Sequence, residues 1–193
     1  MKKPAVFLDR DGTLIAENGY LCTAGELRLL PGAARGVRWL QEAGFRVILV
    51  TNQSAVARGL LTEKQLAEIN KRLLELLKRE GARLDAIYYC PHHPEGLGPY
   101  RQHCCCRKPE PGMLLQAAAG HGLNLGESYL VGDKLTDIIA GKRAGCRTIL
   151  VKTGCGEREL ARAEKEGAIA DFVVENVERA ARLILAARTG KER

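Results

Sequence analysis

The sequence lacks several features that mark other classes of protein. None of its apolar runs approaches the roughly 18 residues that cross a bilayer, so we expect no membrane contact. Only 5% of its residues are aromatic, which argues against a surface for stacking single-stranded nucleic acid. It has no internal repeat and no low-complexity linker. The first apolar run, residues 5–8, is too short for a signal peptide, and we therefore expect a cytoplasmic protein.

The composition that remains is that of a globular domain. Apolar residues make up 46% of the chain and charged residues 27%, the balance typical of a protein with a buried core. A length of 193 residues is sufficient for one well-buried domain, so we expect residues 1–193 to form a single unit. The net charge of +7 suits either an anionic partner or an evenly solvated basic surface.

Short β-branched runs alternate with helical stretches along the whole chain. The runs are residues 5–8, 47–50, 86–89, 128–131, 148–151 and 172–174, each bounded by glycine, aspartate or asparagine. Helices are expected near residues 32–43, 112–120, 134–144 and 177–188, and another between a capping box at 62–65 and Gly81. The pattern predicts a doubly wound α/β parallel sheet, Rossmann-like, whose ligands bind beyond the carboxyl ends of its strands.

Polar residues follow the predicted strands at the positions where a ligand would bind. Asp9 and Asp11 face one cavity because alternate residues of an extended segment point the same way. Two such carboxylates repel each other unless a cation lies between them, and Mg²⁺ suits carboxylates combined with a substrate phosphate. Thr51, Lys108 and Asp133 add a hydroxyl, a positive charge and a third metal ligand. These are the requirements of phosphoryl transfer.

The segment 90–106 interrupts the alternation and has no periodicity of its own. The chain has seven cysteines, and an odd number without an export signal favours metal binding over disulfides. A Cys-x-His pair followed by a Cys-x-Cys pair predicts a closed, structural Zn²⁺ site, although reduced cysteines packed as small apolar side chains are the other interpretation. The expected ligands are Cys90, His92, Cys104 and Cys106. The competing candidates are His93, His103 and Cys105.

Four motifs follow the predicted strands: Asp-Arg-Asp-Gly-Thr at 9–13, Thr-Asn-Gln-Ser at 51–54, Arg-Lys-Pro at 107–109 and Gly-Asp at 132–133. Together they resemble the haloacid-dehalogenase superfamily of phosphotransferases over nearly the whole chain. The resemblance implies that Asp9 is the nucleophile that forms an aspartyl-phosphate and that Asp11 is the general acid/base. It implies that Thr51 and Lys108 bind the phosphate. It also implies that Mg²⁺ is held by the Asp9 side chain, the Asp11 backbone carbonyl and Asp133. No insertion is long enough for a large cap domain, so we expect the haloacid-dehalogenase fold without one.

The cysteine-rich loop narrows the resemblance to one branch of that superfamily. Tyr-Tyr-Cys-Pro-His-His-Pro at 88–94 and Cys-Arg-Lys-Pro at 106–109 are similar to motifs of the heptose bisphosphate phosphatases. The implied activity is removal of the 7-phosphate of a heptose 1,7-bisphosphate, a small sugar phosphate, by a monomeric enzyme of lipopolysaccharide or surface-glycan biosynthesis. The zinc-containing histidinol-phosphate phosphatases are the nearest alternative. A polynucleotide 3′-phosphatase and a non-catalytic zinc-binding module are weaker ones.

The same resemblance indicates which residues contact the substrate. The segment after the nucleophile contacts the sugar in the resembling family, although an ordinary Asn-Gly turn explains this segment equally well. Asp137 is expected to orient Lys108 or a metal-bound water. The candidate substrate-binding residues are Glu17, Asn18, Gly19, Tyr20, Asn52, Gln53, Ser54, Arg58 and Arg107.

Overall fold

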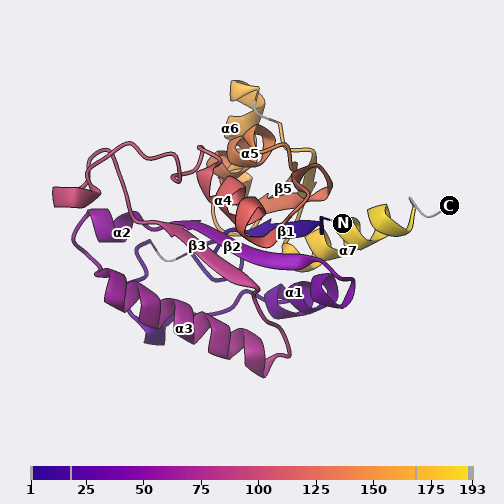
Figure 1. Cartoon of the computed structure of the whole chain (residues 1–193), viewed down its shortest axis with the longest axis horizontal. Coiled ribbons are helices and arrows are strands. Elements are labelled where there is room, and N and C mark those ends of the chain that lie inside the picture. The colour runs from indigo at the N-terminus through magenta and orange to yellow at the C-terminus, as the bar shows by residue number, and fades with distance from the viewer. Residues whose placement is uncertain (1, 18, 168, 191–193) are drawn as a thin grey trace.

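Six parallel strands form the centre of the computed structural model, which describes residues 2–17, 19–167 and 169–190. The strands are β1 (Ala5–Leu8), β2 (Arg46–Asn52), β3 (Ala86–Cys90), β4 (Tyr129–Gly132), β5 (Arg147–Val151) and β6 (Phe172–Val174). Their order across the sheet is β3-β2-β1-β4-β5-β6 (Figure 1). The prediction of a doubly wound parallel sheet is confirmed, and each predicted strand lies within two residues of its observed bounds.

Helices cover both faces of this sheet. The described helices are α1 (Ala33–Glu42), α2 (Ser54–Ala57), α3 (Glu63–Arg79), α4 (Gly112–His121), α5 (Leu135–Arg143), α6 (Gly156–Glu166) and α7 (Val177–Thr189). Figure 1 shows α1, α3 and α7 on one side of the sheet and α4, α5 and α6 on the other. The sequence analysis did not predict α2 and α6. The connections after β1 and β3 contain only the short 3₁₀ turns η1 (Ala24–Glu26) and η2 (Gly98–Tyr100), so the described chain inserts no large cap domain.

The period-two alternation of each strand divides its side chains between two cores. Val6 and Leu8 of β1 belong to the cluster packed under α1, α3 and α7. Ala5 and Phe7 of the same strand belong to the cluster under α4 and α5. All four are fully buried, and burial of a large aliphatic or aromatic side chain stabilises the fold by roughly 1.5–3 kcal/mol. The two-sided burial holds the carboxyl end of β1 in place. No helix in the described part of the chain is long and apolar enough to cross a bilayer.

Helix α3 begins and ends where its sequence signals predict. Thr62 and Gln65 form a complete capping box, which satisfies backbone N–H groups that the first turn leaves unpaired. Gly81 lies just beyond the last turn with φ +72°, a left-handed conformation that suits glycine. The buried stripe of the helix consists of Leu66, Ile69, Leu73 and Leu77, with Asn70 on the same face.

The first residue of α3 also connects the helix to the cysteine-rich segment. The Tyr89 hydroxyl of β3 donates to Glu63 Oε2 at 2.6 Å, and the Tyr100 hydroxyl of η2 donates to Glu63 Oε1 at 2.7 Å. The hydrogen bond from Tyr89, followed by that from Tyr100, lowers the pKa of Glu63 below its usual 4.5. One carboxylate therefore joins α3 both to the strand that precedes the cysteine-rich segment and to the η2 turn within it.

We expect Glu63→Gln to destabilise the protein at neutral pH by about 0.5–1 kcal/mol, because two hydrogen bonds lose their charged acceptor. A carboxyl whose pKa is lowered by folding stabilises the fold above its unfolded pKa and loses that contribution as the pH falls. The difference between wild type and variant should therefore shrink as the pH falls through 4.5 and below. Urea unfolding across this pH range measures it. Glu68→Gln, an exposed change on the same helix, is the control, and equal effects of both changes would contradict the prediction.

Candidate active site

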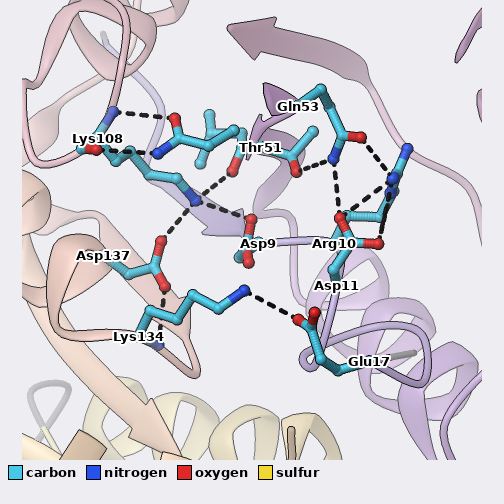
Figure 2. A network of polar contacts seen from close by, with 11 residues as sticks. Asp9, Arg10, Asp11, Glu17, Thr51, Gln53, Lys108, Lys134 and Asp137 are labelled. Carbon is cyan, nitrogen blue, oxygen red and sulfur yellow. Dashed lines mark hydrogen bonds and ion pairs between the residues drawn. The ribbon is translucent and has the colours of Figure 1, made fainter. Parts of the chain in front are cut away.

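The candidate site lies where the strand order reverses, between β1 and β4. Asp9 directly follows β1, Thr51 lies near the end of β2, and Asp133 directly follows β4. Lys108 reaches the same place from the long connection between β3 and α4 (Figure 2). In a doubly wound sheet this reversal opens a crevice beyond the carboxyl ends of the strands. The sequence-predicted catalytic residues therefore meet at the position that the fold reserves for a ligand.

Lys108 is a buried cation between two carboxylates. Its Nζ lies 2.8 Å from Asp9 Oδ1 and 2.5 Å from Asp137 Oδ1, and it donates to the Val50 carbonyl at 2.8 Å. Only 2% of the Lys108 side chain is exposed. Burial on its own lowers the pKa of Lys108, but the charges of Asp137 and Asp9 outweigh it and the net direction is upward. The lysine therefore stays protonated, and Asp137 orients it.

The backbone of Lys108 is held by the side chain of Asn52. The Asn52 Nδ2 group donates to the Lys108 carbonyl at 2.9 Å, and its Oδ1 accepts from the Lys108 N–H at 3.0 Å. These two hydrogen bonds imitate those between neighbouring strands and hold the loop at Lys108 beside the end of β2. The amide of Asn52, expected from the sequence to contact substrate, is thus occupied in placing the lysine.

Three buried carboxylates gather beside the lysine, from Asp9, Asp133 and Asp137, with one oxygen of each within 4.8 Å of the others. Burial, then the charge of Asp9, raises the pKa of Asp133 to about 8, and burial raises that of Asp137 to about 6. Asp133 Oδ2 accepts from the Cys155 N–H at 2.8 Å, but its Oδ1 is buried without a hydrogen-bond partner among the described residues. An orphaned carboxylate oxygen beside a second carboxylate fits a divalent cation.

The turn after Asp11 approaches these carboxylates very closely. Gly12 has φ +79°, and a Cβ at this position would collide with the Asp133 carboxylate. The Gly12 carbonyl accepts from the Thr153 hydroxyl at 2.6 Å, which joins the turn after β1 to the loop after β5. Glycine is required here both for its conformation and for the space, which explains its place in the Asp-x-Asp-Gly-Thr motif.

Asp11 lies beside Asp9 but is held by a different set of partners (Figure 2). Its Oδ1 accepts from Arg10 Nε at 3.2 Å, and its Oδ2 accepts from Gln53 Nε2 at 2.8 Å. The same Gln53 nitrogen donates to the Thr51 hydroxyl at 2.8 Å. No role was expected for Arg10 from the sequence.

Several predicted substrate contacts surround a small cavity of about 90 Å³ next to Asp11. The lining includes Glu17, Gly19, Tyr20, Asn52, Gln53 and Ser54, together with Lys134. Lys134, which sequence reasoning also missed, directly follows Asp133, and its Nζ lies 2.9 Å from Glu17 Oε2. Burial opposes the charge of Lys134, but Asp133 and Asp9 raise its pKa above the usual value. A second protonated lysine, besides Lys108, therefore lies at this end of the sheet.

The remaining predicted contacts lie elsewhere. Arg58 Nη2 lies 3.7 Å from Glu95 Oε2, outside the lining of the small cavity. Arg107 lines a second cavity of about 510 Å³ together with Lys108. Asn18 falls outside the described residues.

The structure brings together the four predicted ligands of the cysteine-rich loop. One donor atom each of Cys90, His92, Cys104 and Cys106 lies within 4.8 Å of the others. His92 Nδ1 is 3.7 Å from Cys90 Sγ and 3.8 Å from Cys106 Sγ. All seven cysteines are free thiols, and the competing candidates His93, His103 and Cys105 lie outside this group. Three thiols and an imidazole form a donor set that suits Zn²⁺.

The fold and the strand-end aspartates define a hydrolase of the haloacid-dehalogenase type, and a HAD-hydrolase-like family model matches residues 105–180. The chain is 45% identical over 156 residues to the D-glycero-beta-D-manno-heptose-1,7-bisphosphate 7-phosphatase of Haemophilus ducreyi, covering 80% of this chain and 86% of that protein. It is 43% identical over 182 residues to the D-glycero-D-manno-heptose-1,7-bisphosphate 7-phosphatase of Thermosynechococcus vestitus, covering 92% and 93%.

A solved structure agrees with these sequence relatives. The crystal structure of D,D-heptose 1,7-bisphosphate phosphatase from B. bronchiseptica, complexed with magnesium and phosphate, superposes with a TM-score of 0.85 at 34% identity. That match covers 95% of this chain and 99% of the other. The chain therefore belongs to the heptose 1,7-bisphosphate 7-phosphatase family, a family of phosphoric monoester hydrolases within the HAD-like group.

We expect Lys108→Met to lower the free energy of unfolding by about 3 kcal/mol, because it leaves buried carboxylates without their cation. Chemical denaturation at neutral pH measures the change. Lys142→Met removes an exposed lysine from α5 and is the matched control, with little expected effect. Equal stability of the Lys108 variant and wild type would show that the carboxylates are accommodated without the lysine.

Proposed function

We propose that this protein removes the 7-phosphate of D-glycero-D-manno-heptose 1,7-bisphosphate through an aspartyl-phosphate at Asp9. The product would be the heptose 1-phosphate used to make nucleotide-activated heptose. The observation that carries the proposal is the buried pairing of Asp9 with Lys108, beside Asp11 and Asp133, in a chain of this family. A nucleophilic carboxylate, a fixed positive charge and an acid/base at adjacent positions are what a two-step phosphoryl transfer requires.

The reaction divides into two displacements. In the first, an Asp9 carboxylate oxygen bonds to phosphorus while the bond from phosphorus to the sugar oxygen breaks, and Asp11 gives its proton to the leaving alkoxide. In the second, the Asp11 carboxylate takes a proton from water as the water oxygen attacks phosphorus and Asp9 leaves. Lys108 supplies positive charge to the phosphoryl oxygens. The Thr51 hydroxyl accepts from Gln53, so its own proton remains available for a phosphate oxygen.

Asp9 and Asp133 are the side chains that fit Mg²⁺, because Asp133 Oδ1 is buried and unpartnered beside Asp9. The Asp11 backbone carbonyl is the further ligand that we propose from the family resemblance. When bound, the ion neutralises part of the negative charge on the transferring phosphoryl group.

The second phosphate of the substrate is expected at the mouth of the site. Burial lowers the pKa of Arg107, and the positive charge of Arg58 lowers it further. A bound phosphate would relieve this repulsion and pair with a guanidinium fork. We therefore propose Arg107, with Arg58, as the contacts of the phosphate that is not removed. The proposed contacts of the sugar are Glu17, Gly19, Tyr20 and Ser54 of the small cavity.

Phosphate release tests the proposed function directly. We expect the heptose bisphosphate, assayed as both anomers with Mg²⁺, to give a higher kcat/KM than histidinol phosphate or a DNA 3′-phosphate. Asp9→Asn should lose turnover of every ester while keeping the circular dichroism of the wild type, since the amide is a poor nucleophile. Preference for histidinol phosphate would reassign the substrate. Retained turnover by Asp9→Asn would refute the covalent mechanism.

We propose that the cysteine-rich loop holds one structural Zn²⁺. The loop has little core of its own, and a closed site with four ligands would supply folding energy. It would also place the catalytic lysine, because Arg107 Nη1 donates to the His92 carbonyl at 3.1 Å immediately before Lys108. Single-domain organisation, a monomeric state and a cytoplasmic location remain predictions.

Elemental analysis checks the zinc site with a matched pair of variants. Cys106→Ser removes a ligand and should lower both the zinc content and the phosphatase activity. Cys105→Ser changes the exposed neighbouring thiol and should keep one zinc per chain. If instead the Cys105 variant lost its zinc and the Cys106 variant kept it, Cys105 and not Cys106 would be the ligand.

A further inference from the structure

Arg10 is the largest fully buried side chain of the protein, with 1% of it exposed. Removing a guanidinium from water costs several kcal/mol unless its charge and N–H groups are paired. Phe7 and Leu8, shortly before it in the chain, are apolar core residues, and an apolar side chain would be the usual occupant of so buried a position. The buried charge therefore requires an explanation beyond packing.

All three nitrogens of the Arg10 guanidinium have hydrogen-bond partners. Its Nη2 lies 3.1 Å from both Asp11 oxygens and donates to Gln53 Oε1 at 2.7 Å. Its Nη1 donates to Asn70 Oδ1 on α3 at 3.2 Å. The guanidinium thus anchors the carboxylate of Asp11 to a rigid helix.

Gln53 completes the arrangement from the other side (Figure 2). Its carbonyl accepts from Arg10, and its amide nitrogen donates both to Asp11 Oδ2 and to the Thr51 hydroxyl, each at 2.8 Å. One side chain therefore fixes the distance between Asp11 and Thr51. Both oxygens of Asp11 are restrained, which leaves its carboxyl group little freedom to rotate.

We propose that Arg10 and Gln53 are positioning residues that hold the Asp11 carboxyl in line with the leaving oxygen and stabilise the negative charge it acquires on giving up its proton. This inference rests on the acid/base role of Asp11 in the proposed function. The side chains that receive hydrogen bonds from the guanidinium are Asp11, Gln53 and Asn70, and the nucleophile Asp9 is not among them. Its effect on the reaction passes through Asp11.

The chemistry of the leaving group separates this role from a merely structural one. A sugar alkoxide needs a proton as it departs, whereas p-nitrophenolate is a stable anion that leaves without one. General acid catalysis contributes typically about 10²–10⁴-fold where it is needed. A residue that positions the acid should therefore affect sugar phosphates far more than p-nitrophenyl phosphate.

The experiment compares Arg10→Met, Arg10→Lys and Asp11→Asn on the two esters with Mg²⁺. We expect Arg10→Met to lower kcat/KM on the heptose bisphosphate by about 100-fold, and kcat/KM on p-nitrophenyl phosphate by about threefold or less. The comparison uses kcat/KM because this constant covers the steps up to the aspartyl-phosphate, whereas hydrolysis of that shared intermediate also needs Asp11 and can lower kcat on both esters. Arg10→Lys should recover part of the loss because it keeps the charge without the fork. Asp11→Asn should show the same leaving-group pattern, and the double variant should lose little more.

Asn70→Ala tests the anchor on α3, since it removes the acceptor of Arg10 Nη1 and leaves the contacts of Arg10 with Asp11 in place. It should lower kcat/KM on the heptose bisphosphate by a smaller factor than Arg10→Met, and again more than on p-nitrophenyl phosphate. If Arg10→Met does not unfold cooperatively, Arg10→Lys provides the test, with a smaller loss of the same selectivity expected.

Equal losses of kcat/KM on the two esters, in a folded variant, would overturn the positioning role while leaving the proposed function intact. If wild type does not hydrolyse the heptose bisphosphate, the alkyl phosphate that it hydrolyses fastest replaces it, and the comparison still decides the role of Arg10. Failure of wild type on every phosphate ester would overturn the proposed function and this inference together.

Discussion

The buried ammonium group of Lys108 is the interaction on which the rest of the site depends. It holds Asp9 after β1 and Asp137 of α5, and it donates a hydrogen bond to the Val50 carbonyl of β2. Without a cation these acids would repel one another or take up protons. Yet Lys108 belongs to no helix or strand, and its backbone is fixed by Asn52 and by the cysteine-rich segment before it. The charge balance of the site is therefore set by a loop.

Much of this arrangement could be predicted from the sequence because it follows from one rule of parallel sheets. The carboxyl ends of the strands share an edge, so Asp9, Thr51 and Asp133 meet even though they are far apart in the chain. The strands themselves were recognisable because two-sided burial leaves short, uninterrupted apolar runs. The motif at the end of each run then carried the chemistry.

The features that were missed depend on tertiary pairing or on weak periodicity. Arg10 points toward the core, where a charge is not expected, and its acceptor Asn70 lies on a different element. The ion pair of Lys134 with Glu17 joins segments that share no local signal. Helix α6 escaped prediction because its sequence is mostly charged and has no sustained apolar stripe, although Ala163 is buried against α5 and β5. Only the folded chain shows such partners.

The cysteine-rich segment shows how a long loop can hold a buried lysine in a fixed position. A loop without a core pays conformational entropy for each ordered residue and has few contacts to offset it. Here three of its thiols lie close to His92, and Glu63 accepts hydrogen bonds from Tyr89 and Tyr100. Arg107, which directly precedes Lys108, donates to the His92 carbonyl. A bound metal would supply the missing cohesion. Stability of the loop and position of the catalytic charge would then depend on the same four ligands, and loss of one should impair both together.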